Sequence, residues 1–248
     1  TAIALGGPGA VLWMWLTGVF GIATKYAEAL LSVKYRITTP QGTMAGGPMY
    51  VLERGMKNKP LAIFFAAMTA VAAFGIGNMV QANSISTLVQ ETFRVPTWIT
   101  GAVMTVLTAI VIIGGIKSIA RSCEKLVPFM ALFYVIGCVI LLVIGWRQIP
   151  HSVLLIFQSA FTGQAAIGGF AGAGVKEALR YGIARGLFSN ESGMGSAPIV
   201  AAAARTKTPV RQALVSSTGT FWDTVVICAV TGLVLVNSGG WTRGLNGA

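Results

Sequence analysis

Long apolar runs separated by short polar stretches dominate the hydrophobic pattern of this chain. Five charge-free runs of about 20 residues or more are long enough to cross a ~30 Å hydrocarbon core as helices. These runs are residues 1–24, 61–90, 96–116, 126–146 and 152–175. A sixth run, 212–242, contains one charge, Asp223. Because lipid cannot satisfy the backbone of an open sheet, the pattern predicts an all-α integral membrane fold, with residues 1–248 as one transmembrane domain of about six helices.

Composition agrees with this prediction. Charged residues make up 10% of the chain and hydrophobic residues 54%, with a mean hydropathy of +0.74. Soluble domains carry roughly 25% charged residues, so this chain has too little polar surface to coat a globule in water.

The net charge of +11 reflects membrane topology rather than nucleic-acid binding. Fifteen basic residues follow the first, third and fifth runs, and three lie on the opposite side. The three are Arg94, Arg147 and Arg243. By the positive-inside rule, the first loop is cytoplasmic and both ends of the chain are extracytoplasmic, in a multi-pass protein of the plasma (inner) membrane. We therefore expect the lipid bilayer as a partner and no nucleic acid.

Two segments have a distinctive local pattern. Residues 34–59 form the predicted cytoplasmic loop, with a short amphipathic helix that starts at Pro48 and is capped by Gly55. Residues 152–190 read as a broken, glycine-rich helix, because five glycines fall within residues 163–174 and each weakens a helix by roughly 1 kcal/mol. A break of this kind exposes backbone groups that can bind an ion or a carboxylate.

Glycines in the other runs predict close helix packing through small residues. They are Gly6, Gly7, Gly9, Gly18 and Gly21 in the first run, and Gly75 and Gly77 in the second.

Catalytic motifs are missing from the sequence. His151 is the one histidine, so neither a zinc HExxH site nor a histidine-based nucleophile pattern can be built, and no phosphate-binding GxxxxGK[ST] motif occurs. We therefore expect no enzymatic activity and no organic cofactor. The chain starts in an apolar stretch without Met, and we expect it to be an internal piece of a longer protein.

Polar groups inside the runs are the candidate binding residues. Asn78 and Gln81 share one helix face, where ligand binding and helix–helix hydrogen bonding explain them equally well. Thr162 and Gln164 lie at mid-membrane depth and are candidate ion ligands. Asp223 is the strongest signal, since a carboxylate within a membrane is costly; it could bind a cation, be protonated and hydrogen-bonded, or pair with another helix.

One further pair, Lys25 and Glu28, lies at i and i+3 near the inner end of the first run. Its spacing predicts a structural ion pair.

Several motifs resemble the alanine/glycine:cation symporter family. The longest are GGPGAVLWMWLTGVFG at residues 6–21 and GLFSNESGMGSAP at residues 186–198. Shorter ones are KYAEAL at 25–30, TPQGTMAGGPMY at 39–50 and GNMVQAN at 77–83. Together with the glycine-rich fifth run, these motifs extend the resemblance over nearly the whole chain.

The resemblance implies a LeuT-type fold of five plus five inverted repeats, of which this chain would supply family helices 2 to 7. It also implies coupling of sodium, or in some members a proton, to uptake of alanine or glycine. By the family pattern Gln81 would contact the substrate. The unwound part of the sixth family helix would be Gly168, Gly169, Phe170, Ala171 and Gly172.

The sequence therefore predicts secondary active transport of a small neutral amino acid driven by sodium. The alternative is a channel-like pore or a structural membrane subunit that does not transport.

The charge asymmetry generates a test of topology. With single cysteines in an otherwise cysteine-free complete protein, Asn58→Cys and Lys207→Cys should be protected from an impermeant thiol reagent in right-side-out membranes. Gln148→Cys should react. The reverse labelling pattern would invert the predicted orientation.

Overall fold

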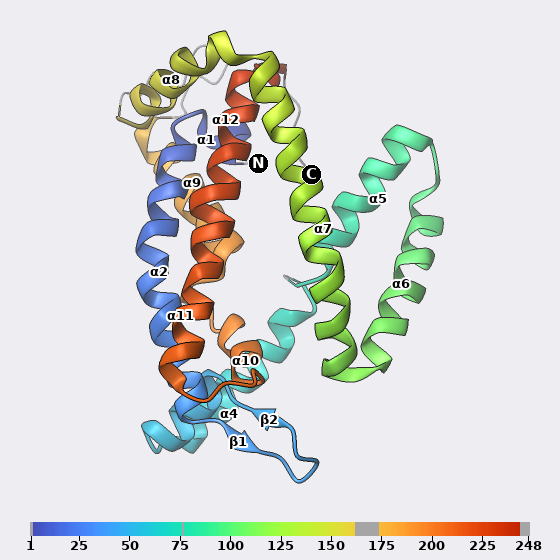
Figure 1. Ribbon diagram of the computed structural model, residues 1–248, viewed down its shortest axis with the longest axis vertical. Coiled ribbons are helices and arrows are strands. Elements are labelled where there is room, and N and C mark those ends of the chain that lie inside the picture. The colour runs from blue at the N-terminus through green and yellow to red at the C-terminus, as the bar shows by residue number, and fades with distance from the viewer. Residues whose placement is uncertain (1, 76, 162–173, 244–248) are drawn as a thin grey trace. The chain divides into compact units, whose positions relative to one another are not determined.

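The computed structural model describes residues 2–75, 77–161 and 174–243, which are almost entirely helical (Figure 1). The all-α prediction is confirmed for this part of the chain, apart from one short hairpin. The chain divides into two compact units, which we call the large unit (residues 1–67 and 141–247) and the small unit (residues 68–140). Each unit is described by itself.

The large unit contains most of the helices. They are α1 (Ala2–Gly6), α2 (Ala10–Lys34), α3 (Pro48–Tyr50), η1 (Val51–Gly55), η2 (Trp146–Gln148), α8 (Ile149–Phe161), α9 (Val175–Asn190), α10 (Ala197–Ala202), α11 (Pro209–Thr220), η3 (Phe221–Cys228), α12 (Ala229–Asn237) and η4 (Gly240–Arg243). A two-stranded antiparallel hairpin, β1 (Ile37–Thr38) and β2 (Met44–Ala45), follows α2.

The small unit contains α5 (Met79–Phe93), α6 (Thr97–Ile113) and most of α7 (Gly115–Ile144). The helix α4 (Lys59–Ala73) begins in the large unit and ends in the small unit. Within the small unit, α5 and α6 pack against each other.

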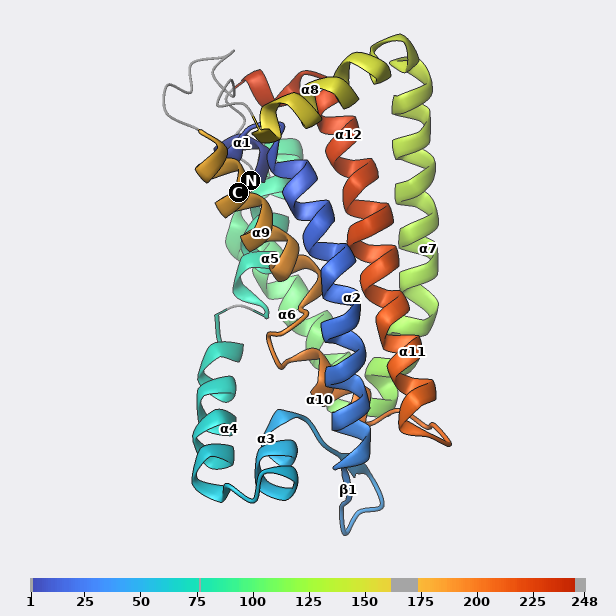
Figure 2. The ribbon, with the colours of Figure 1, turned by 90° about the vertical axis from the view of Figure 1, so that its left-hand side faces the viewer.

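Helix α2 is the centre of the large unit, and α8, α9, α10, α11 and η3 all contact it (Figure 2). An apolar core lies around its N-terminal half, where Val11 and Leu12 pack with Ile156 of α8 and Val236 of α12. A smaller cluster around Ala29 packs against α10 and α11. Most helices of the large unit therefore contact α2.

Glycines on α2 permit this close packing. A Cβ atom at Gly18 would lie 2.6 Å from Cγ2 of Thr224, and one at Gly9 would lie 2.5 Å from the backbone of Ser159. Real Cβ atoms do not approach so closely, so only glycine fits. The close-packing prediction is confirmed for these two glycines and for Gly21, where Ser192 Oγ would be 3.0 Å away.

Helix α9 contributes matching glycines. A Cβ atom at Gly182 would lie 2.6 Å from the carbonyl oxygen of Ala10, and one at Gly186 would lie 3.1 Å from that of Met14. The two glycines are one turn apart on the same face, the spacing that lets two membrane helices approach backbone to backbone. The α2–α9 contact thus depends on small residues of both helices.

In the part of the chain that the structure describes, two helical segments are long and apolar enough to cross a membrane. They are Ser118–Ile144 within α7 and the continuous segment Pro209–Asn237, which joins α11, η3 and α12. Helices α4 and α6 are shorter but apolar. The total of six spans stays a prediction.

The second predicted run does not form one helix. Helix α4 ends at Ala73 and α5 begins at Met79, so the expectation of a continuous helix over residues 61–90 is wrong. The close packing expected at Gly75 and Gly77 is also not found among the described residues, where a Cβ atom would meet only carbonyl oxygens of the preceding turn, 3.9 and 3.7 Å away. These glycines favour a break because each is a poor helix former.

The glycine contacts generate a stability prediction. Gly182→Ala places a methyl group against the Ala10 carbonyl and should lower the melting temperature of the detergent-purified complete protein, because overpacking typically costs about 1–3 kcal/mol. Gly219→Ala is the matched control, since a Cβ atom at this α11 position meets nothing within 4 Å. This control should be neutral or slightly stabilising, as Ala favours helix by roughly 1 kcal/mol over Gly. Equal melting temperatures for the two variants would contradict the packing argument.

Candidate functional site

A cluster of polar and charged side chains lies where α2, the C-terminal end of α9 and η3 meet in the large unit. We call it the polar cluster. Its members are Lys25, Glu28, Ser189, Asn190, Glu191, Ser192, Thr220, Asp223 and Thr224. Four of them are buried: Asn190, Ser192, Thr220 and Thr224. Because these buried polar groups lie together with charged side chains, this cluster is the first candidate for a functional site.

Asp223 lies at the midpoint of the segment Pro209–Asn237, 14 residues from either end. At about 1.5 Å per residue it is roughly 21 Å from both ends of the segment, and its position at the middle of a bilayer stays a prediction. Its Oδ2 accepts hydrogen bonds from Ser189 Oγ at 2.7 Å and from Thr224 Oγ1 at 2.8 Å. Two hydroxyl donors stabilise the carboxylate without cancelling its charge.

The backbone around Asp223 is also unusual. Residues Phe221–Cys228 form a π-helix, a wider turn that occurs frequently at functional sites. The Cys228 thiol lies 3.3 Å from Ser189 Oγ, so the hydroxyl connects the carboxylate of Asp223 to a second polar group of η3.

Lys25 connects α2 to the end of α9. Its Nζ donates a 2.8 Å hydrogen bond to the carbonyl oxygen of Asn190, the last residue of α9. Burial lowers the pKa of Lys25 below its usual range, and the carboxylates of Glu191, Glu28 and Asp223 oppose this shift only in part. The ion pair predicted between Lys25 and Glu28 is not formed, although both residues lie in the described part of the chain.

Asn190 organises the turn that follows α9. Its Oδ1 accepts a 2.9 Å hydrogen bond from the backbone N–H of Ser192, while Glu191 ends the helix with a left-handed φ of 56°. Ser192 Oγ lies 3.4 Å from Thr220 Oγ1. Two buried atoms of the cluster, Asn190 Nδ2 and Glu28 Oε2, have no hydrogen-bond partner among the described residues.

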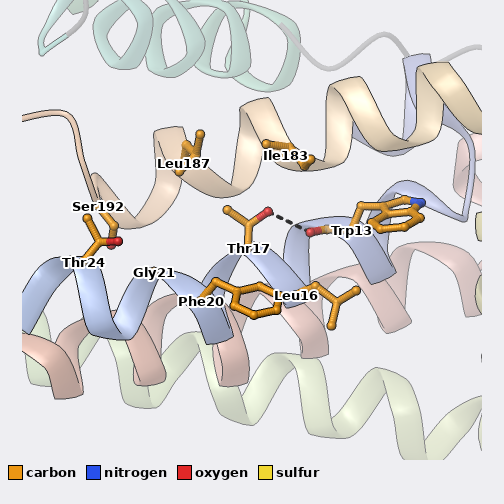
Figure 3. A pocket seen from close by; sticks show the side chains of 9 residues that line it. All are labelled: Trp13, Leu16, Thr17, Phe20, Gly21, Thr24, Ile183, Leu187 and Ser192. Carbon is orange, nitrogen blue, oxygen red and sulfur yellow. Dashed lines mark hydrogen bonds between the residues drawn. The ribbon is translucent and has the colours of Figure 1, made fainter.

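A hollow of about 290 Å³ lies between α2 and α9 beside the cluster (Figure 3). Its lining is mostly apolar and comprises Trp13, Leu16, Thr17, Phe20, Gly21, Thr24, Ile183, Leu187 and Ser192. Figure 3 shows Thr24 and Ser192 together at one end and Trp13 at the other. The hollow therefore has one polar end, which adjoins the polar cluster.

The structure places three of the predicted site residues. Asp223 lies in the polar cluster. Asn78 is the N-cap residue of α5, and Gln81 lies in the first turn of that helix; both are exposed in the small unit. The break before α5 was not predicted, although Gly75 and Gly77 were its signal.

The remaining predicted site residues lie outside the described residues. They are the ion-ligand candidates Thr162 and Gln164 and the glycine-rich set Gly168, Gly169, Phe170, Ala171 and Gly172. The structure does place the helices on either side, α8 and α9.

Several residues of the polar cluster were not singled out from the sequence. Ser189, Asn190 and Thr224 are small polar residues, a type common in any helix. The run of four consecutive polar residues Ser189–Asn190–Glu191–Ser192 at the C-terminal end of α9 is the signal that could have found them. Among the residues that the structure describes, no three His, Cys, Asp or Glu side chains gather where they could hold a metal ion.

Comparison with known proteins extends the earlier resemblance. Residues 1–248 match the profile of the Sodium:alanine symporter family. The chain is 52% identical over 243 residues to "Sodium/alanine symporter AgcS" of Methanococcus maripaludis, covering 96% of this chain and 53% of that protein. It is 51% identical over 244 residues to an "Uncharacterized transporter" of Haemophilus influenzae, covering 98% and 54%. It is also 36% identical over 247 residues to "Probable sodium/glutamine symporter GlnT" of Bacillus subtilis, covering 99% and 51%. The chain thus spans about half the length of the curated relatives it matches.

Proposed function

The chain belongs to the sodium:alanine symporter family, a family of membrane transporters, and from this premise we propose that the complete protein is a sodium-coupled symporter of alanine or glycine. The family match over all 248 residues carries the proposal. The 52% identity to a sodium/alanine symporter supports alanine as the substrate ahead of glutamine, which is named for the relative at 36%.

We also propose the LeuT-type arrangement for the complete protein, in which this chain supplies family helices 2 to 7. In that arrangement α2 is the second family helix, α4 and α5 the third, and the segment Pro209–Asn237 the seventh. Asn78 and Gln81, beside the break before α5, and the glycine-rich residues Gly168, Gly169, Phe170, Ala171 and Gly172 are the proposed substrate-binding residues. The long apolar segments support this proposal by composition.

Asp223 is the proposed ligand of the coupling cation. Sodium is a hard cation that prefers oxygen ligands, and carboxylate and hydroxyl oxygens meet here at mid-helix depth. The charge of the polar cluster supports this role. Lys25 contributes one positive charge, and the carboxylates contribute three negative charges, which gives a formal net charge of −2. The carboxylates are Glu28, Glu191 and Asp223. Both hydrogen bonds described for Asp223 use Oδ2, which leaves Oδ1 for a cation.

The function is tested by uptake in proteoliposomes that contain the complete protein. An inward sodium gradient should concentrate labelled alanine above its equilibrium level, and a sodium ionophore should abolish the accumulation. Unlabelled glycine and glutamine, added as competitors, would rank the substrates. A channel-like pore would only equilibrate alanine, and a structural subunit would not move it; either result would replace the proposal.

The proposed ion and substrate residues can be separated with two variants in the same assay. Asp223→Asn keeps the size and hydrogen bonding of the side chain but removes its charge, so the sodium concentration for half-maximal uptake should rise at least about fivefold. Gln81→Leu removes a polar contact to the substrate, so the alanine concentration for half-maximal uptake should rise roughly 5- to 150-fold, as expected for ~1–3 kcal/mol.

Each variant serves as the control for the other. Asp223→Asn should leave the alanine dependence nearly unchanged at saturating sodium, and Gln81→Leu should do the same for the sodium dependence at saturating alanine. Glu91→Gln, an exposed charge loss on α5, should change neither. If Asp223→Asn shows normal sodium dependence at normal expression, Asp223 is a structural residue that joins α9 to η3.

A further inference from the structure

The contact between Lys25 and the end of α9 has the properties of a switch. We propose that Lys25 is a two-position latch: it holds the C-terminal end of α9 against α2 in this structure, and it pairs with Glu28 on its own helix when that end moves away. The proposal concerns how α9 is held and does not depend on which solute the complete protein transports.

The first position is the one observed. The last carbonyl groups of a helix have no partner within the helix and carry its negative dipole end, so a cation bound there is stabilised. Lys25 Nζ occupies this place, 2.8 Å from the carbonyl oxygen of Asn190. Because the ammonium is only half-buried, the contact can form and break without leaving a fully buried, unpaired charge.

The second position is provided by Glu28. This residue is three positions after Lys25 on α2, a spacing at which side chains of one helix meet. Its Oε2 is buried and has no hydrogen-bond partner among the residues that the structure describes, and an unsatisfied buried acceptor in a native protein calls for an explanation. Pairing with Lys25 would satisfy this oxygen, so each position of the ammonium satisfies a different group. Two exclusive arrangements of this kind make a bistable element.

The burial of Ser192, at the polar end of the hollow between α2 and α9, is what the latch would control. Thr24, which directly precedes Lys25, and Ser192, which is two residues beyond Asn190, line the polar end of the hollow (Figure 3). Ser192 is only 3% exposed while α9 is held. Displacing the end of α9 would uncover Ser192.

The exposure of residue 192 therefore reports the latch. The complete protein is purified in detergent with Cys123, Cys138, Cys228 and any other cysteine replaced by serine, and Ser192→Cys is introduced as the only thiol. Lys25→Met should accelerate its reaction with a water-soluble maleimide by about tenfold, because the held state loses its tether. Glu28→Gln should slow the reaction, because the released state loses its ion pair. Opposite shifts from two residues of one cluster are not expected from general loosening.

Matched variants exclude simpler explanations. Lys34→Met, an exposed lysine of the same helix, should leave the rate unchanged, and Lys25→Arg should restore it to near that of the parent. A thiol at exposed Gln41 in the hairpin turn should react equally in all backgrounds. An unchanged rate in Lys25→Met, or acceleration in both Lys25→Met and Glu28→Gln, would overturn the latch. If Lys25→Met does not give a single peak in size-exclusion chromatography, Lys25→Gln replaces it. The latch then requires faster labelling in Lys25→Gln and slower labelling in Glu28→Gln, and any other pair of rates overturns it.

The labelling readout does not require transport. If the protein labels as expected but does not accumulate alanine, the latch is supported and the proposed function is contradicted. If it accumulates alanine but does not label as expected, the proposed function is supported and the latch is contradicted.

Discussion

The close approach of α2 to its neighbours is the constraint on which the rest of the large unit depends. Helices in lipid gain little from burying apolar surface, so they associate through van der Waals contact, which small residues bring to its best distance. Gly182 and Gly186 bring α9 onto the backbone of α2, and Gly18 brings η3 onto it through Thr224. Lys25 can reach Asn190, and Ser189 can reach Asp223, only because these backbones are so near. The polar cluster is thus a product of glycine packing several residues away.

The sequence predicted those features that depend on local information. Apolar runs located α6, α7 and the segment Pro209–Asn237, because spanning length and charge exclusion are properties of consecutive residues. The break between α4 and α5 was missed, because the mean hydropathy over a long window stays high even where two glycines interrupt the helix. Asp223 was found because a single carboxylate stands out in an apolar run.

The partners of charged residues could not be predicted in the same way. The spacing of Lys25 and Glu28 indicated an ion pair, whereas the actual acceptor is a backbone carbonyl 165 residues further along the chain. A backbone carbonyl leaves no trace in the residue type. Likewise, nothing in Ser189 or Thr224 as residue types marks them as donors to Asp223; that role follows from how α9 and η3 face each other.

The π-helix Phe221–Cys228 has a consequence for the register of the whole segment. Each residue of an α-helix turns the chain by about 100°, so a single residue added or removed rotates everything beyond it by that angle. A wide turn contains one more residue than an α-turn would, and it sets the direction of α12 relative to α11. Beyond it, Asn237 accepts a hydrogen bond from Ser152 at 3.0 Å and donates one to Gly145 at 3.1 Å. A one-residue deletion in η3 that restored regular winding would turn Asn237 away from both. The number of residues in this segment is therefore constrained on both sides of Asp223. Natural insertions and deletions are not expected there, because each would rotate the residues beyond it away from their partners.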